Sequence, residues 1–160
     1  MSASFSKIIY ELKNRNFNKA LKLSNECKVN NDLHILNNLK GIIFINLKDY
    51  QKAIHHFQNS LNCKQDYIDA YSNLANAYFS IKNFSKSIKT IIKALNYEPK
   101  NENLNFKLAY FFSENHEYLK AIKQYQKAMK LGYNKELVLN NIGNIYIKEK
   151  NYLKAKEYFI

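Results

Sequence analysis

The fold of this chain is set by one stretch between residues 70 and 99, which begins Ala70-Tyr71-Ser72-Asn73-Leu74-Ala75-Asn76-Ala77-Tyr78. Leu74, Ala75 and Tyr78 are spaced so that they share one face of a predicted helix. After a short turn, a second predicted helix carries its own apolar face, formed by Phe84, Ser87, Ile91 and Ala94. A single helix pair cannot bury both faces by itself, so the stretch predicts that similar pairs are stacked beside it.

The predicted copies are present along the whole chain. An aromatic residue followed three positions later by a small one recurs after about 33 residues once and after about 34 residues from then on. The five occurrences are Phe17/Ala20, Tyr50/Ala53, Phe84/Ser87, Tyr118/Ala121 and Tyr152/Ala155. Small residues let two helices cross closely, and the aromatic residues fill the space where they diverge. The sequence therefore predicts an all-α solenoid of about five stacked helix-turn-helix units.

The repeat spacing also predicts the domain organisation. We expect one domain over residues 1–160, with units at about 1–33, 34–67, 68–101, 102–135 and 136–160. The last unit is incomplete by this spacing, which leads us to expect an amino-terminal part of a longer protein or a truncated one. Expected helix caps are Asn16, Asp49, Asn83 and Asn151 at helix starts, and Gly132 at a helix end.

The central unit resembles the tetratricopeptide repeat family, whose 34-residue signature is W-x2-L-G-x2-Y, then A-x3-F, then Pro. Leu74-Ala75 stand for the Leu-Gly pair, Ser87 and Ile91 for A-x3-F, and Pro99 for the closing proline. No unit has the tryptophan. The resemblance implies a right-handed superhelix that acts as a protein-interaction scaffold and holds a partner peptide in its concave groove.

Composition narrows the function classes. The chain has 46% hydrophobic residues, only 3 glycines and 1 proline, and a formal net charge of +12. It has no apolar run of the length that spans a membrane and no signal-peptide pattern, so we expect a cytoplasmic protein. No spacing of Cys, His, Ser or carboxylate residues indicates a nucleophile or a metal site, and no phosphate-binding loop is present. We therefore expect no enzyme activity, no cofactor and no small-molecule substrate.

The candidate partner-binding residues lie opposite the buried face of the first helix of each unit. Amides and aromatic rings dominate this face, which also carries Glu114 and Ile147. An amide can donate to and accept from a peptide unit of any sequence. The residues at which we expect contacts are Asn38, Asn73, Asn76, Phe79, Phe106, Lys107, Tyr110, Asn140, Asn141 and Asn144.

Two segments, Asn73-Leu74-Ala75-Asn76 and Asn141-Ile142-Gly143-Asn144, are similar to the Asn-Leu-Gly-Asn segment in the repeats of O-linked N-acetylglucosamine transferase. In that family, groove asparagines contact the backbone of an extended peptide. The alternative is that these amides only face solvent, because asparagine is abundant throughout this chain.

The second helices carry the positive charge as a basic ridge, which consists of Lys86, Lys89, Lys93, Lys120, Lys123 and Lys127. Such a ridge either keeps the stack soluble or binds phosphates of nucleic acid or of an anionic membrane. Three hypotheses follow. The first is a scaffold for protein or peptide partners, and the second is the substrate-presenting arm of a larger glycosyltransferase or sulfotransferase. The third is a polyanion binder.

Overall fold

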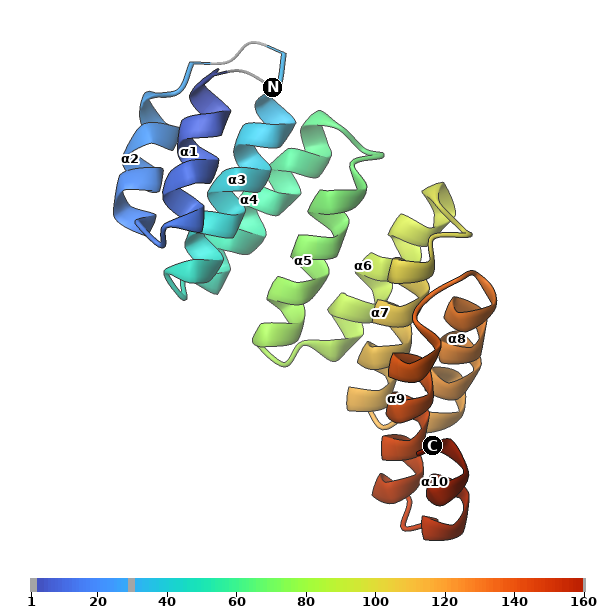
Figure 1. Ribbon diagram of the computed structural model, residues 1–160. Helices are drawn as coiled ribbons and strands as arrows, with labels where there is room; N and C mark the ends of the chain where they lie inside the picture. Colours follow the sequence, from blue (N-terminus) through green and yellow to red (C-terminus); the bar gives the residue numbers. More distant parts are fainter. Residues whose placement is uncertain (1–2, 29–30, 160) are drawn as a thin grey trace. The chain divides into compact units, whose positions relative to one another are not determined.

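The computed structural model of the chain describes residues 3–28 and 31–159 and contains, within them, ten α-helices and no strand (Figure 1). The helices are α1 (Ala3–Lys13), α2 (Phe17–Glu26), α3 (Leu33–Asn46), α4 (Tyr50–Cys63), α5 (Ile68–Ser80), α6 (Phe84–Tyr97), α7 (Glu102–Glu114), α8 (Tyr118–Lys130), α9 (Lys135–Lys148) and α10 (Tyr152–Tyr158). Odd-numbered helices are the first helices of the predicted units, and even-numbered helices are the second ones. The prediction of an all-α stack of helix pairs is confirmed.

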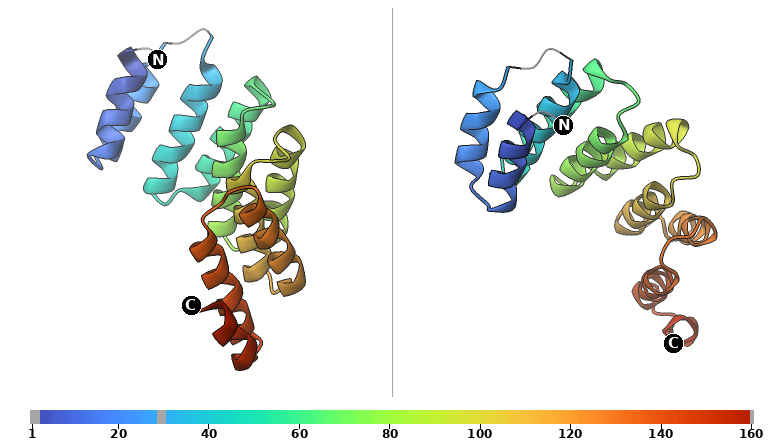
Figure 2. Two further views of the ribbon diagram at one scale, coloured as in Figure 1. Left: turned by 45° about the vertical axis from the view of Figure 1, so that its right-hand side comes forward. Right: turned by 45° about the horizontal axis from the view of Figure 1, so that its top comes forward.

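The helices are grouped into two compact units. The first unit ends at Asn83 and contains α1 to α5, and the second begins at Phe84 and contains α6 to α10. Within the first unit α3 packs against α4 and α5, and within the second α7 packs against α6 and α8 (Figure 2). The boundary falls between α5 and α6, inside the predicted repeat 68–101. The single domain and its repeat boundaries stay a prediction.

The core of the first unit depends on a small residue facing a large ring. Phe57 on α4 is fully buried, and its ring lies against Gly41 on α3. A Cβ atom added at Gly41 would lie 2.4 Å from Cε1 of Phe57, well inside contact distance. Ala53, one turn before Phe57, is also fully buried. Close approach of α3 and α4 therefore requires the missing side chain at Gly41.

The second unit has the same design. Ala121 and Tyr125 on α8 are both fully buried, as the recurrence of small and aromatic residues predicts. Phe111 on α7 and Ile142 and Ile145 on α9 each expose at most 2% of their surface. Apolar side chains from three successive helices thus form the core of this unit.

Each turn within a helix pair uses a residue in the left-handed backbone region. The residues are Arg15, Lys48, Lys82, His116 and Lys150, with φ values of 58°, 62°, 59°, 61° and 59°. At each of them the next amide N–H reaches back five residues, as when Asp49 N donates to the carbonyl oxygen of Phe44 at 2.9 Å. This bond satisfies a carbonyl group that the ending helix leaves open. The same turn conformation therefore occurs once in every helix pair.

Asn16, Asp49 and Asn151 occupy the predicted N-cap positions, Asn83 directly precedes α6, and two of these residues cap a helix through their side chains. Asp49 accepts from the amide N–H of Lys52, and Asn151 accepts from that of Lys154. Asn16 makes no capping bond through its side chain, because its side-chain amide donates to Oε2 of Glu11 at 2.8 Å instead. Gly132 has a φ of 103° after the end of α8, in agreement with the expected helix end.

Replacing Lys48 with glycine is expected to raise the free energy of unfolding by about 0.5–1 kcal/mol, because glycine has no Cβ atom to strain the left-handed backbone. The gain is smaller than the full strain because glycine also makes the unfolded chain more flexible. Urea unfolding of the purified variants measures the effect. Lys48→Ala keeps the Cβ atom and is expected to stay close to the native value. Equal stability of the two variants would contradict this explanation.

Candidate functional site

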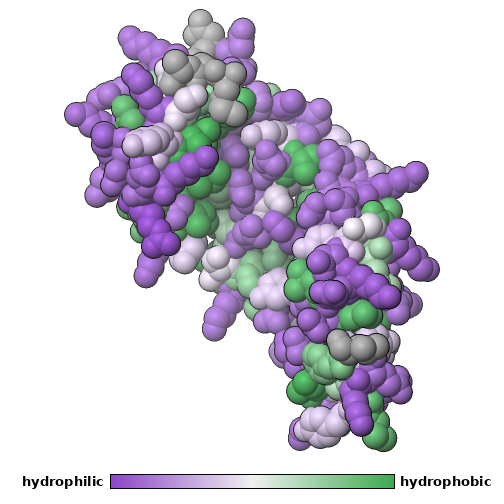
Figure 3. Space-filling model, viewed as in Figure 1, coloured by the Kyte–Doolittle hydropathy of each residue, from purple (hydrophilic) through white to green (hydrophobic). Residues whose placement is uncertain are grey.

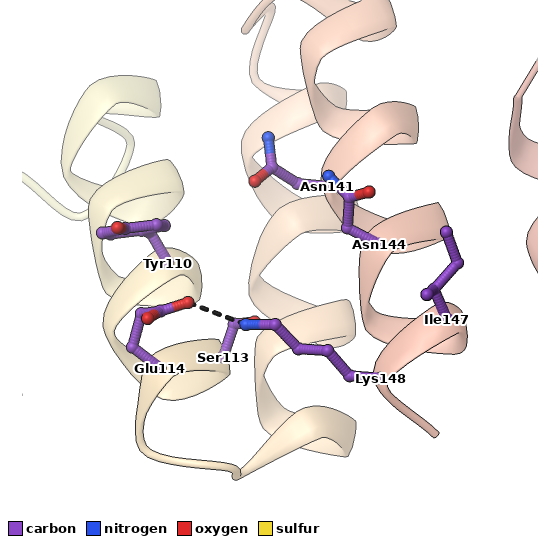
Figure 4. A pocket seen from close by; sticks show the side chains of 7 residues that line it. All are labelled: Tyr110, Ser113, Glu114, Asn141, Asn144, Ile147 and Lys148. Atoms are coloured by element: carbon purple, nitrogen blue, oxygen red, sulfur yellow. Dashed lines mark hydrogen bonds and ion pairs between the residues drawn. The ribbon is translucent and has the colours of Figure 1, made fainter. Parts of the chain in front are cut away.

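In the second compact unit, α7 and α9 line a hollow of about 320 Å³. They are the first helices of the last two predicted repeats. Figure 4 shows the side chains that surround it: Tyr110, Ser113 and Glu114 from α7, and Asn141, Asn144, Ile147 and Lys148 from α9. The predicted residues Tyr110, Asn141 and Asn144 therefore come together at one place. They come together because α9 packs beside α7, so that equivalent faces of two successive repeats are neighbours.

An ion pair joins α7 and α9 at the edge of this hollow. Nζ of Lys148 lies 2.8 Å from Oε1 of Glu114, and both side chains are partly exposed. A pair at this exposure adds little to stability, so its main effect is to place one charge of each sign at the edge of the hollow. Burial, together with the negative charge of Glu114, raises the pKa of Tyr110 above its usual value, so the phenol stays neutral. Tyr110 is still 38% exposed.

The two asparagines on α9 have different surroundings. Oδ1 of Asn141 accepts from the hydroxyl group of Tyr125 at 3.2 Å, and its Nδ2 donates to the carbonyl oxygen of Leu137 at 2.7 Å. Asn141 is therefore held in place by the core of the unit. Asn144 is exposed, and no hydrogen bond to its side chain is found among the described residues. Its amide is available to a ligand in the hollow.

Phe106, Lys107 and Asn140 do not line the hollow. The ring of Phe106 stacks on that of Tyr133, with ring centres 4.1 Å apart, and meets Tyr125 edge-on at 5.2 Å. Lys107 is partly buried, and this burial lowers the pKa of its ammonium group. Asn140 is exposed on α9.

In the first compact unit two of the three predicted asparagines bond to each other. Asn38 on α3 is buried, and its Oδ1 accepts from Nδ2 of Asn73 on α5 at 2.9 Å. Asn76 is exposed and Phe79 is partly buried. The Asn38 amide thus supports Asn73 and does not face solvent. A role for these four residues in binding stays a prediction.

Sequence reasoning did not include Ser113 and Lys148 on the binding face. A signal for Lys148 was present, because Glu114 and Lys148 are 34 residues apart and so hold equivalent positions in successive repeats. Opposite charges at equivalent positions of stacked helices indicate an ion pair between repeats.

Several lysines of the second helices have a structural contact. Nζ of Lys52 lies 5.4 Å from the ring centre of Phe44, and the equivalent distances are 5.5 Å for Lys120 over Phe112 and for Lys154 over Tyr146. Lys120 also pairs with Glu117. Ammonium groups over aromatic rings are attracted by the ring electrons. Lys120 of the predicted basic ridge is therefore engaged within its own helix pair although it is exposed, and the other ridge residues are exposed as well: Lys86, Lys89, Lys93, Lys123 and Lys127.

His56 on α4 is partly buried, whereas the neighbouring His55 is exposed. Its ring stacks on Phe44 with a centre distance of 5.3 Å and an interplanar angle of 4°, and its Nδ1 lies 3.3 Å from Oδ1 of Asn37. Burial is the main reason why the pKa of His56 lies below its usual value, and the charge of Lys40 adds to the effect.

The lowered pKa of His56 makes stability depend on pH. The unfolded chain takes up the proton more readily than the folded chain, so the contribution of His56 to stability is present above its ordinary pKa of about 6.5 and is lost as the pH falls. We expect the free energy of unfolding in urea to decrease between about pH 7.5 and about pH 5.5. The decrease should be smaller for His56→Gln, and an unchanged pH slope in that variant would contradict the assignment.

Within the part of the chain that the structure describes, no group of three or more His, Cys, Asp or Glu side chains is arranged to hold a metal ion. No helix in residues 3–28 and 31–159 is both long enough and apolar enough to cross a membrane.

Comparison with known proteins supports the repeat assignment. Residues 68–101 and 138–160 match the family model described as tetratricopeptide repeat. The first matched segment coincides with the predicted central repeat, 68–101. No curated protein matches the chain.

Solved structures described as MamA share the fold. The structure of MamA residues 41 to the end from Desulfovibrio magneticus RS-1 is 18% identical, covers 98% of this chain and 89% of its own, and has a TM-score of 0.81. A crystal structure of MamA is also 18% identical, covers 99% of this chain and 91% of its own, and has a TM-score of 0.82. At these identities the likeness shows the fold alone. The similarity of the asparagines to those of O-linked N-acetylglucosamine transferase stays a prediction.

Proposed function

We propose that the chain is a protein-interaction scaffold whose α7–α9 surface binds a short peptide segment of a partner. The observation that carries this proposal is the exposed amide of Asn144 beside Tyr110 and Ile147 in the hollow between the two helices. Stacked helical repeats commonly offer such surfaces to extended or helical segments. The matches to the tetratricopeptide repeat model support the same class of function.

The chemistry of the hollow suits a peptide. Asn144 can donate to and accept from one peptide unit, whatever side chain that unit carries. Ile147 is 45% exposed and offers an apolar contact, while the neutral phenol of Tyr110 combines an apolar ring with a hydrogen-bonding group. The Glu114–Lys148 pair lies at the edge, where it can meet a polar or charged side chain. A volume of about 320 Å³ holds a short segment and not a folded domain.

The core beneath the hollow prepares the site for binding. Asn141 is fixed between the Tyr125 hydroxyl group and the Leu137 carbonyl oxygen, so the wall of the hollow needs no rearrangement. A site that is already ordered loses less entropy when it binds. Tyr125 therefore acts on binding through Asn141, without touching the ligand.

Selection from a random peptide library against the purified chain tests the proposal. We expect a selected peptide whose Kd increases at least tenfold for Tyr110→Ala, as is usual for a central aromatic contact, and about 2- to 13-fold for Asn144→Ala, as one hydrogen bond requires. The control is Asn62→Ala, which removes an exposed amide from α4. Failure to select any peptide, or equal Kd values for all three variants, would overturn the proposal.

A further inference from the structure

The outward face of α8 carries a row of lysines and no acidic residue. Lys120, Lys123, Lys127 and Lys130 are exposed, and α8 contains neither Asp nor Glu. At 100° per residue these four side chains fall on the side of the helix opposite the buried residues Ala121, Tyr125 and Ala128. Lys120 is held by Glu117 and Phe112, while Lys123, Lys127 and Lys130 make no ion pair among the described residues.

One leucine is exposed on α8 itself, and another is exposed on α10. Leu119 on α8 is 77% exposed and Leu153 on α10 is 84% exposed. They hold the same position in successive repeats, and the other three pairs have Asn18, Gln51 and Ser85 there. A face that served only solubility would keep a polar residue at this position, as those three pairs do. The change to leucine is confined to the two last pairs and indicates a partner with an apolar component.

The two leucine-bearing helices lie on the same side of the second unit. Figures 1 and 2 show α8 and α10 on one side of α7 and α9. In Figure 3, green apolar patches occur among the purple hydrophilic surface around α9 and α10. On α10 the outward position one turn after Leu153 is the exposed Glu157, the repeat equivalent of Lys123, and the exposed Lys156 and Tyr152 lie toward the sides of the helix. The positive charge of this surface therefore lies on α8, and each of the two helices adds one exposed leucine.

We propose that the outward face of α8 and α10 binds the surface of an anionic lipid bilayer. Lysines are attracted to the negative headgroups, and leucine and tyrosine side chains favour the boundary between headgroups and acyl chains. Nucleic acid fits less well, because phosphates attract the lysines but give the exposed leucines no apolar contact. The proposal concerns a different surface from the α7–α9 hollow and does not depend on peptide binding there.

Vesicle co-sedimentation tests this proposal on the full chain. The vesicles consist of phosphatidylcholine alone or with about 30% phosphatidylserine, an anionic lipid. We expect binding only to the anionic vesicles. Each lysine near the surface contributes about fivefold, so the triple variant Lys123→Gln, Lys127→Gln and Lys130→Gln should lose on the order of 100-fold in partitioning. The matched control changes three exposed lysines of the first unit, Lys13, Lys22 and Lys64, to glutamine, and should retain most of the binding.

The leucines separate a bilayer from other polyanions. The double variant Leu119→Gln and Leu153→Gln should weaken vesicle binding roughly fivefold or more while leaving retention on heparin unchanged. Circular dichroism confirms that each variant is folded. Equal vesicle binding by the two lysine variants would overturn the proposal. So would heparin retention without vesicle binding, which would assign the face to nucleic-acid-like polyanions.

Discussion

Replacing Tyr125 with alanine is expected to lower the free energy of unfolding by about 3–5 kcal/mol, the usual cost of removing a fully buried aromatic side chain. Tyr125 has no exposed surface, and its ring packs edge-on against Phe106. Its hydroxyl group also donates to Asn141 on α9. The substitution therefore leaves a cavity between α7 and α9 and removes the support of Asn141. Urea unfolding followed by circular dichroism measures the loss.

The variant Tyr125→Phe separates the two roles of this side chain. It keeps the ring and removes only the hydroxyl group, so we expect a loss of about 0.5–1.5 kcal/mol. Because Asn141 then lacks its partner, peptide binding in the hollow should weaken although Tyr125 does not touch the peptide. A loss below about 1 kcal/mol for Tyr125→Ala would contradict its placement in the core.

Replacing Gly41 with alanine is expected to destabilise the first unit by about 1–3 kcal/mol through overpacking. In an exposed helix the same change stabilises by about 1 kcal/mol, because alanine favours the helix, so the sign of the effect is diagnostic. The new Cβ atom would lie 2.4 Å from the ring of Phe57, which is fully buried and has no room to move. Urea unfolding again provides the measurement.

Gly143 on α9 is the matched control, since it holds the same repeat position. A Cβ atom there would lie 2.7 Å from the ring of Phe159, but that ring is 40% exposed and can turn away. We expect Gly143→Ala to be neutral or stabilising. Equal destabilisation by both substitutions would show that the close approach at Gly41 is not the cause.

The helix pairs were predictable because their signals are local. Buried positions recur every three or four residues within a helix and every 34 residues along the chain, and no neighbouring element is needed to see them. Ala121, Tyr125 and Gly41 fall where this pattern places them. The left-handed turn residues gave no such signal. Lys48, Lys82 and Lys150 are of a residue type that rarely adopts positive φ, and their position after a helix end is what forces it.

The candidate site was only partly predictable, because it depends on how helices pack. The periodicity of α3 places Asn38 on the predicted binding face of that helix. However, α5 packs Asn73 against Asn38, and Asn38 is buried. Likewise, the hollow exists because α9 packs beside α7, which brings Lys148 to Glu114. Periodicity identifies the face of a helix, but the neighbouring helix decides which residues on that face remain accessible.

Photo-crosslinking from position 144 tests most directly the claim that the α7–α9 hollow is the binding site. A photoreactive amino acid replaces Asn144 in one sample and Asn62 on α4 in another, and each is irradiated with a peptide selected against the native chain. We predict a crosslink from position 144, none from position 62, and loss of the crosslink when unlabelled peptide is added in excess. Crosslinking from both positions, or only from position 62, would contradict the account.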